Sequence, residues 1–232
     1  MTVKVYMLDT APLLKAWEEK DPAVDLLYAS LSEKRQEKIQ RFRYPKGKAL
    51  SLGAGLLLDY GLGRHGLRER EVAMAYGADE KPYLKDYPDI HFNLSHSGAM
   101  AMAAFADRQV GCDVEQEGKP DYRIVRRFFA PEEIRALEEQ TEECKRARMF
   151  YRFWTLKESF LKVTGKGIRM PLNDFAIFLG PPVQVKQAGE GKPYGFKEFS
   201  LPGYQAALCV EGAEPGIFAK IQFLSWGPEG LV

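Results

Sequence analysis

The segment IHFNLSHSGAMAMAAFADRQVGCDVE, residues 90–115, contains three consecutive stretches that predict β-strands. Residues 90–94, 99–106 and 110–115 are rich in apolar side chains, and the polar residues 107–109 predict a turn between the last two. The middle of the chain is therefore expected to contain β-structure, with polar and charged side chains clustered at residues 93–98 and 111–115.

Helical patterns lie on both sides of this segment. Residues 143–164 give the clearest helix, which Gly165 and Gly167 are expected to end. Ser32 can cap a basic helix at 33–42, and a small, apolar helix is predicted at about 49–60. Pro131 suits the first turn of a further helix. Additional strands are predicted at residues 3–8, 71–76, 175–179, 205–210 and 218–224, and a loop at 79–89.

The composition is that of a globular protein with no global electrostatic bias. The 232 residues are 45% hydrophobic and 28% charged, and the net charge is +1. This charge gives no general attraction to nucleic acid or to anionic membranes. No signal peptide or membrane-spanning run is recognised, and the three cysteines have neither zinc nor redox spacing. We expect a cytoplasmic protein with two lobes, at residues 1–106 and 107–232.

The first chemical pattern is Gly111-Cys112-Asp113-Val114-Glu115. On a strand, Asp113 and Glu115 share one face, while Cys112 and Val114 point to the other, toward the core. Two adjacent carboxylates repel each other unless a cation joins them, and a few oxygen ligands suit Mg²⁺. The alternative is that both acids are solvated on a half-exposed strand.

The second pattern interrupts the apolar stripe of the helix at 143–164. Apolar residues recur at 149/150, 153/154 and 160/161, but the intervening step is Lys157-Glu158. Lys157 would lie near the middle of the stripe and Glu158 at its edge beside Trp154. Buried charge is costly unless it is paired or liganded, so this step is a candidate site. An exposed salt bridge over a loose core is the alternative.

The third pattern is Asn93-Leu94-Ser95-His96-Ser97-Gly98, a polar strand end followed by glycine. Its hydroxyl, imidazole and backbone groups suit a phosphate cradle. Neighbouring strand residues point to opposite faces, so His96 is not expected to activate Ser95 or Ser97 as a nucleophile. A simple polar turn between strands is the alternative.

Taken in this order, the three patterns resemble the 4′-phosphopantetheinyl transferase superfamily. The chain is similar to its long, broad-specificity type, which activates nonribosomal peptide and polyketide synthases. The resemblance covers about residues 30–180. The matching segments are residues 81–84, 92–98, 111–115, 127–129 and 153–162, with Gly165-Lys166-Gly167.

The resemblance implies a fold and an activity. The fold would be α+β, with two similar lobes in a pseudo-twofold arrangement, each a helix packed on a small antiparallel sheet, and the site in the cleft between them. The activity would be Mg²⁺-dependent transfer of 4′-phosphopantetheine from coenzyme A to a serine of an acyl or peptidyl carrier protein, with release of 3′,5′-ADP. Mn²⁺ could replace Mg²⁺, and the enzyme would be a monomer.

The resemblance also implies roles for individual residues. Asp113, Glu115 and Glu158 would bind the metal, and Glu158 would also deprotonate the carrier serine. Asp113, Glu158 and Lys162 form the implied catalytic set. Binding of coenzyme A would fall to cationic and polar side chains along the chain, namely Lys34, Lys38, Lys81, Ser95, His96, Lys157 and Lys162, together with Asp113.

Two departures from the family pattern concern the phosphate contacts. Glu80 precedes Lys81 where the family commonly has glycine, and lysines stand near residues 46–48 where an arginine is usual. Three other readings are weighed against the transferase: a magnesium-dependent phosphodiester or nucleotide hydrolase, a silent module that binds coenzyme A, and a plain interaction domain. The retained carboxylates argue against the silent module, and the charged pair in the apolar stripe argues against the interaction domain.

Overall fold

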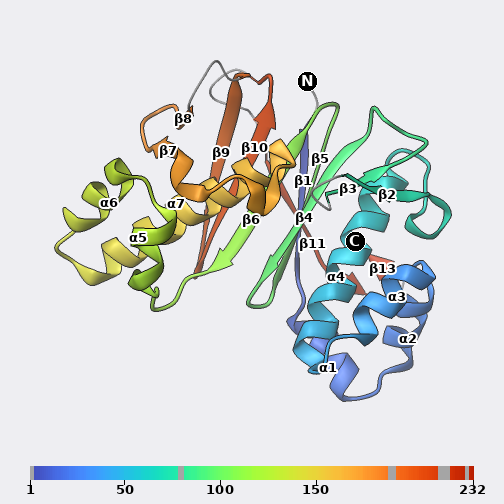
Figure 1. The fold of residues 1–232 in the computed structure, drawn as a ribbon. Helices are drawn as coiled ribbons and strands as arrows, with labels where there is room; N and C mark the ends of the chain where they lie inside the picture. The colour runs from blue at the N-terminus through green and yellow to red at the C-terminus, as the bar shows by residue number, and fades with distance from the viewer. Residues whose placement is uncertain (1–2, 78–80, 188–191, 214–219, 228–229) are drawn as a thin grey trace.

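The computed structural model describes residues 3–77, 81–187, 192–213, 220–227 and 230–232. Two lobes lie side by side, each with one long helix packed on a sheet (Figure 1). Helix α4 (Pro45–Gly63) belongs to the first lobe and α7 (Glu143–Thr164) to the second. This arrangement confirms the α+β class. No helix within the described part of the chain is long and apolar enough to cross a membrane.

The sheet of the first lobe has four strands in the order β11-β1-β5-β4. They are β1 (Val3–Asp9), β4 (His91–Ser97), β5 (Met100–Ala106) and β11 (Ile221–Leu224). The pairs β1–β5 and β4–β5 are antiparallel, whereas β1 and β11 run parallel. Two small ladders join β2 (Met74–Tyr76) to β3 (Pro82–Leu84), and β12 (Trp226–Gly227) to β13 (Gly230–Leu231).

Three shorter helices and a 3₁₀ turn complete the first lobe. They are α1 (Ala11–Glu18), α2 (Pro22–Ala29), α3 (Glu33–Gln40) and η1 (Glu69–Glu71). The hydroxyl of Ser32 accepts a hydrogen bond from the backbone N–H of Arg35, which confirms the predicted cap of the basic helix. Helices α1 and α2 occupy residues to which no element was assigned from the sequence.

The sheet of the second lobe has the order β6-β10-β9 and is antiparallel. Its strands are β6 (Val110–Gln116), β9 (Tyr194–Leu201) and β10 (Tyr204–Glu211). The other elements are α5 (Val125–Phe128), α6 (Pro131–Glu138), β7 (Phe175–Phe178), β8 (Gln184–Gln187), η2 (Tyr122–Ile124), η3 (Gly167–Arg169) and η4 (Leu172–Asp174). Helix α7 has the predicted bounds, and Gly165 ends it at φ +67°.

The two lobes share a third core between their sheets. Along β5, Ala101, Ala103 and Phe105 pack toward α4, while Met102 and Ala104 pack with the second sheet. The second sheet contributes alternate residues of β6 and β10 to the same core, namely Val110, Cys112, Val114, Ala206, Leu208 and Val210. The layers therefore run helix, sheet, sheet, helix, and the apolar contact between the sheets holds the lobes as one packed body.

Three local expectations need correction. The predicted division after residue 106 falls in the turn between β5 and β6, but β11 returns to the first sheet, and Leu224 packs in the first core. The strand predicted at 71–76 contains only β2, and part of the loop predicted at 79–89 forms β3. Residues 79–80 of the predicted loop lie outside the described residues, and so do residues 218–219 of the strand predicted at 218–224. The β1–β11 pairing joins distant segments, so local patterns could not reveal it.

Candidate active site

Strand β6 carries its acidic residues on the face that meets α7. A Cβ added at Gly111 would lie 2.1 Å from the carbonyl oxygen of Ser159 and 2.5 Å from the backbone nitrogen of Val163. Glycine therefore allows the helix to pack directly on the strand. Asp113 and Glu115 follow on the same face, as predicted, because side chains two residues apart on a strand share a face.

A buried hydrogen-bonded cluster joins this strand to α7 and β4. The ammonium of Lys162 donates to Asp113 Oδ1 at 2.6 Å, to Ser95 Oγ at 3.1 Å and to the carbonyl of Cys112 at 3.2 Å. Ser95 Oγ also donates to Asp113 Oδ1 at 2.8 Å. Burial disfavours the charged lysine, but Asp113, together with Cys112 and Glu158, outweighs burial and raises the pKa of Lys162.

This cluster opens into a 420 Å³ cavity between the lobes. Asp113, Glu115 and Glu158 line the end formed by the second lobe. Burial raises the pKa of Glu158, and the charge of Asp113 adds to that shift while Lys162 opposes it. Burial likewise raises the pKa of Glu115, against hydrogen bonds from Ser97 and Trp154. These carboxylates line one cavity and raise one another's cost of ionisation, so a cation bound there would stabilise their charged forms.

The carboxylates fit a hard divalent cation. The Oδ2 atom of Asp113 is buried and has no hydrogen-bond partner, so one carboxylate oxygen remains available to a ligand. Oxygen donors of this type suit Mg²⁺. Across the described ranges, no three side chains of histidine, cysteine, aspartate or glutamate are already gathered as a metal-ligand group. Asp113, Glu115 and Glu158 thus share a cavity without forming a closed cluster.

The opposite end of the cavity is basic and belongs to the first lobe. Arg35 and Lys38 of α3 and His96 of β4 line it. Burial lowers the pKa of His96, and the nearby Lys38 adds to this effect. Ser51 of α4 also lines this end, and its buried hydroxyl has no hydrogen-bond partner.

Arg35 and Ser51 were not among the predicted site residues. Arg35 could have been found from the sequence, since the residues at 34, 35 and 38 of a helix lie within one turn or adjacent turns. Nothing local marks Ser51, because the reason for its importance is the unpaired hydroxyl inside a folded cavity.

The predicted residue Lys34 lies in an adjoining 940 Å³ cavity, which Arg35 and Lys38 also line. Its ammonium lies 5.7 Å from the centre of the Tyr76 ring. The basic helix therefore borders two neighbouring cavities. Lys38 lines both, whereas Lys34 lines only the one that lacks Asp113, Glu115 and Glu158.

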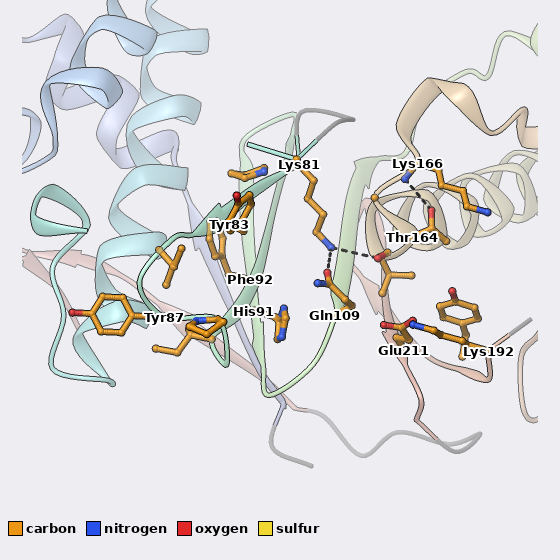
Figure 2. Close-up of a pocket in the computed structure, with 18 of the residues that line it drawn as sticks. Lys81, Tyr83, Tyr87, His91, Phe92, Gln109, Thr164, Lys166, Lys192 and Glu211 are labelled. Carbon is orange, nitrogen blue, oxygen red and sulfur yellow. Dashed lines mark hydrogen bonds and ion pairs between the residues drawn. The ribbon is translucent and has the colours of Figure 1, made fainter. Parts of the chain in front are cut away.

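Lys81 lies between the lobes near the C-terminal end of α7 (Figure 2). Its ammonium donates to Gln109 Oε1 at 2.9 Å and to the carbonyl of Val110 at 3.1 Å. Burial lowers the pKa of Lys81 to about 8. Lys81 lines the 740 Å³ cavity drawn in Figure 2 and also a 710 Å³ cavity that contains Glu158 and Lys162. Glu80, which departs from the family pattern, lies outside the described residues.

Lys157 is not at the site, and its predicted role in binding coenzyme A needs correction. The side chain is fully buried, and its ammonium contacts both carboxylate oxygens of Glu133 in α6 at 2.7 Å and the carbonyl of Phe175 at 2.9 Å. Burial lowers the pKa of Lys157 and raises that of Glu133, while their contact opposes both shifts. Lys157 interrupts the apolar stripe because Glu133 supplies a partner inside the core.

An apolar cavity adjoins the acidic end. Its walls include Phe128, Trp154, Leu161, Met170 and Leu172, and Glu158 and Lys162 stand at the border with the carboxylate cluster. The fold and cavity thus define a class of site: acids and a lysine of one lobe lie opposite basic side chains of the other, which suits a metal-dependent enzyme that works on a phosphate ester.

Comparison with known proteins identifies the family. The family model described as the 4′-phosphopantetheinyl transferase superfamily matches residues 109–209, and the model described as 4′-phosphopantetheinyl transferase, N-terminal, matches residues 15–107. The two matched ranges meet between β5 and β6. The chain belongs to the 4′-phosphopantetheinyl transferase superfamily and is an enzyme of that class.

Individual relatives support this placement over most of the chain. The chain is 30% identical to the 4′-phosphopantetheinyl transferase Sfp of Bacillus subtilis, over 84% of this chain and 88% of that protein. It is 30% identical to the 4′-phosphopantetheinyl transferase psf-1 of Bacillus pumilus, over 96% and 95%. With the 4′-phosphopantetheinyl transferase HetI of a Nostoc species the identity is 34%, over 69% and 70%. These similarities confirm the resemblance found in the sequence.

Proposed function

We propose that this enzyme transfers 4′-phosphopantetheine from coenzyme A to a serine of a carrier protein and releases 3′,5′-ADP. The observation that carries the proposal is the unpaired, buried Oδ2 of Asp113. It lies in a cavity with two further carboxylates at one end and two cationic side chains and a histidine at the other. A divalent cation and a polyphosphate ester together would satisfy both ends.

Asp113, Glu115 and Glu158 would hold Mg²⁺, and Mn²⁺ could take its place. The metal would supply positive charge to the pyrophosphate oxygens and neutralise the clustered carboxylates. On the protein side, Asp113 is already oriented by Lys162 and Ser95, which leaves its second oxygen for the metal.

The first lobe would recognise the nucleotide end of coenzyme A. Arg35, Lys38, His96 and Ser51 offer charge and hydrogen bonds to the 3′-phosphate from one end of the cavity. Lys34 and Lys81 border adjoining cavities, where they would contact the adenosine part or a phosphate oxygen. Phosphate binding by several side chains and a hydroxyl matches the chemistry of a dianion.

The second lobe would carry the chemical step. The serine oxygen forms a bond to the β-phosphorus, the bond from that phosphorus to the bridging oxygen breaks, and 3′,5′-ADP leaves. Glu158, whose pKa is raised by burial and by Asp113, accepts the serine proton. Lys162 remains protonated beside Asp113 and balances charge on the phosphate oxygens.

The apolar cavity beside Glu158 has the walls expected for the pantetheine arm and the approaching carrier. The carriers would be acyl or peptidyl carrier domains, including those of peptide and polyketide synthases. A monomer acting in the cytoplasm would suffice, because both ends of the cavity come from one chain.

Intact-mass spectrometry of an apo carrier protein tests the proposal directly. The carrier incubated with enzyme, coenzyme A and Mg²⁺ should gain the mass of one phosphopantetheine group, and EDTA should prevent the gain. Cleavage of coenzyme A with an unmodified carrier would contradict transfer and indicate hydrolysis. No modification of several carrier classes would contradict it as well.

A further inference from the structure

Strands β4 and β6 belong to different sheets, and side chains join them in place of a backbone ladder. Three alternate residues of β4 accept hydrogen bonds from three alternate backbone N–H groups of β6. The pairs are Asn93 with Cys112 at 2.9 Å, Ser95 with Val114 at 3.3 Å, and Ser97 with Gln116 at 3.2 Å. We call these three contacts the interlobe zipper. They satisfy edge donors of β6 that no neighbouring strand pairs.

The two serines of the zipper have a second hydrogen bond that the asparagine lacks. A hydroxyl both accepts and donates, so each serine can take a backbone N–H and still give its own proton away. Ser95 donates to Asp113 at 2.8 Å, and Ser97 donates to Glu115 Oε2 at 2.6 Å. The edge of the first lobe therefore reaches two of the proposed metal ligands, whereas Asn93 reaches none of them.

Glu115 depends on neutral donors more than Asp113 does. Asp113 is held by the ammonium of Lys162 as well as by Ser95. For Glu115, the hydrogen-bond donors are the hydroxyl of Ser97 and the side chain of Trp154. Since these two donors come from different lobes, the orientation of Glu115 depends on how the lobes meet.

The position of Ser97 is fixed by the turn that follows it. Gly98 has φ +64°, and a Cβ there would lie 2.5 Å from Gln116 Oε1 and 2.6 Å from the hydroxyl of Tyr204. The backbone N–H of Ala99 donates to that tyrosine hydroxyl at 3.0 Å. The turn between β4 and β5 therefore packs against Gln116 and Tyr204 of the second lobe. This packing fixes the Ser97 hydroxyl beside β6.

We propose that Ser97 is a positioning residue that orients Glu115 toward the divalent cation through its hydroxyl. This inference rests on the proposed function, because it gives Glu115 its role as a metal ligand. Ser97 does not line the carboxylate cavity itself, and its hydroxyl bonds to Glu115 and to the backbone N–H of Gln116, so it acts through Glu115. Partners that orient a metal ligand typically contribute about 10–100-fold to metal affinity.

Binding of Mn²⁺ to the full-length enzyme in the presence of coenzyme A tests the proposal, with electron paramagnetic resonance reporting free Mn²⁺. Ser97→Ala should raise the Kd for Mn²⁺ about tenfold or more. Ser97→Thr, which keeps the hydroxyl, should restore affinity to within about threefold of wild type. The affinity for coenzyme A without metal should be unchanged, because Ser97 lies outside the basic end of the cavity.

Asn93→Ala is the matched control within the zipper. It removes a contact between the lobes that touches no carboxylate, so it should lower the Tm while leaving Mn²⁺ affinity near wild type. Wild-type Mn²⁺ affinity in Ser97→Ala would overturn the proposal, and so would an equal loss of affinity in Asn93→Ala. Failure of the proposed function would give a different result. Ser97→Ala would still weaken Mn²⁺ binding, but the wild-type enzyme would leave apo carriers unmodified.

Discussion

The acidic and basic ends of the active-site cavity are built in different ways. At the acidic end, Asp113 is buried and hydrogen-bonded to Lys162, both on elements of the second lobe. At the basic end, Lys38 of the first lobe is exposed, whereas Arg35 beside it is mostly buried and lies 3.7 Å from Glu69. Buried charges require fixed partners, whereas exposed charges are screened by water and keep their freedom. We therefore infer that the acidic end is preorganised for the proposed chemistry, and that Lys38 is suited to recognise a ligand that supplies the opposite charge.

The largest expected effect comes from the proposed general base. Glu158→Gln keeps the size of the side chain but cannot accept the serine proton, so we expect turnover to fall about 10²–10⁴-fold. Affinity for coenzyme A should change little, because the basic end is intact. Single-turnover modification of a carrier, followed by mass spectrometry, measures the rate. Near-normal turnover would remove Glu158 from this role.

A change at the basic end should separate affinity from rate. Lys38→Met removes one exposed charge, so we expect the KM for coenzyme A to rise by at most about fivefold while kcat stays near wild type. Steady-state kinetics with varied coenzyme A makes the measurement. A large fall in kcat with unchanged KM would contradict the proposal that the first lobe binds coenzyme A and the second lobe carries the chemical step.

Lys157 and Lys162 of α7 should have different roles, with Lys157 stabilising the fold. Lys157→Met leaves the Glu133 carboxylate buried without its cation, which should cost about 3–5 kcal/mol in free energy of unfolding. Urea unfolding followed by circular dichroism measures it, and Lys157→Met with Glu133→Leu should recover much of the loss. The folded fraction should bind coenzyme A as the wild type does. If Lys157→Met kept full stability but lost affinity for coenzyme A, Lys157 would instead be assigned to phosphate binding.

The lowered pKa of Lys81 predicts that binding of coenzyme A depends on pH. Its pKa is lowered to about 8, so the side chain loses its proton as the pH rises through that value. Phosphate contact requires the protonated form, and KM for coenzyme A should therefore rise by up to about tenfold between pH 7 and pH 9. Lys81→Arg, which stays charged over this range, should flatten the profile. An identical profile in that variant would assign the titration to another group.

The smallest effect concerns salt. A net charge of +1 gives little long-range attraction, so the KM for the carrier should change by less than about threefold between 50 and 200 mM salt. Initial rates at several ionic strengths test this expectation. A collapse of activity over that range would show that local cations steer the carrier.

Much of the fold was visible in local patterns. The bounds of α7, the cap at Ser32 and the shared face of Asp113 and Glu115 follow from helical period, side-chain capping and strand alternation, all of which act over a few residues. The return of β11 to the first sheet was missed, because pairing across more than two hundred residues leaves no mark in either segment.

The candidate site was predicted in part. The cavity brings together Ser95, His96, Asp113, Glu158 and Lys162, which lie in three separate motifs of the sequence. Lys157 was placed correctly in the apolar stripe but was given the wrong partner, because Glu133 comes from another helix. A charge inside a stripe shows that a partner is needed and does not show whether that partner is a ligand or a core residue.

The sequence by itself determined the residue types that can do this chemistry and the faces on which they lie. Those properties depend on the repeat of a helix or strand, which each segment sets for itself. Only the tertiary structure decided that Lys162 meets Asp113, that Lys157 meets Glu133, and that Ser97 reaches Glu115 across the lobes. These partnerships depend on the packing of two sheets and their helices into one body, and distances between separate elements exist only after that packing has formed.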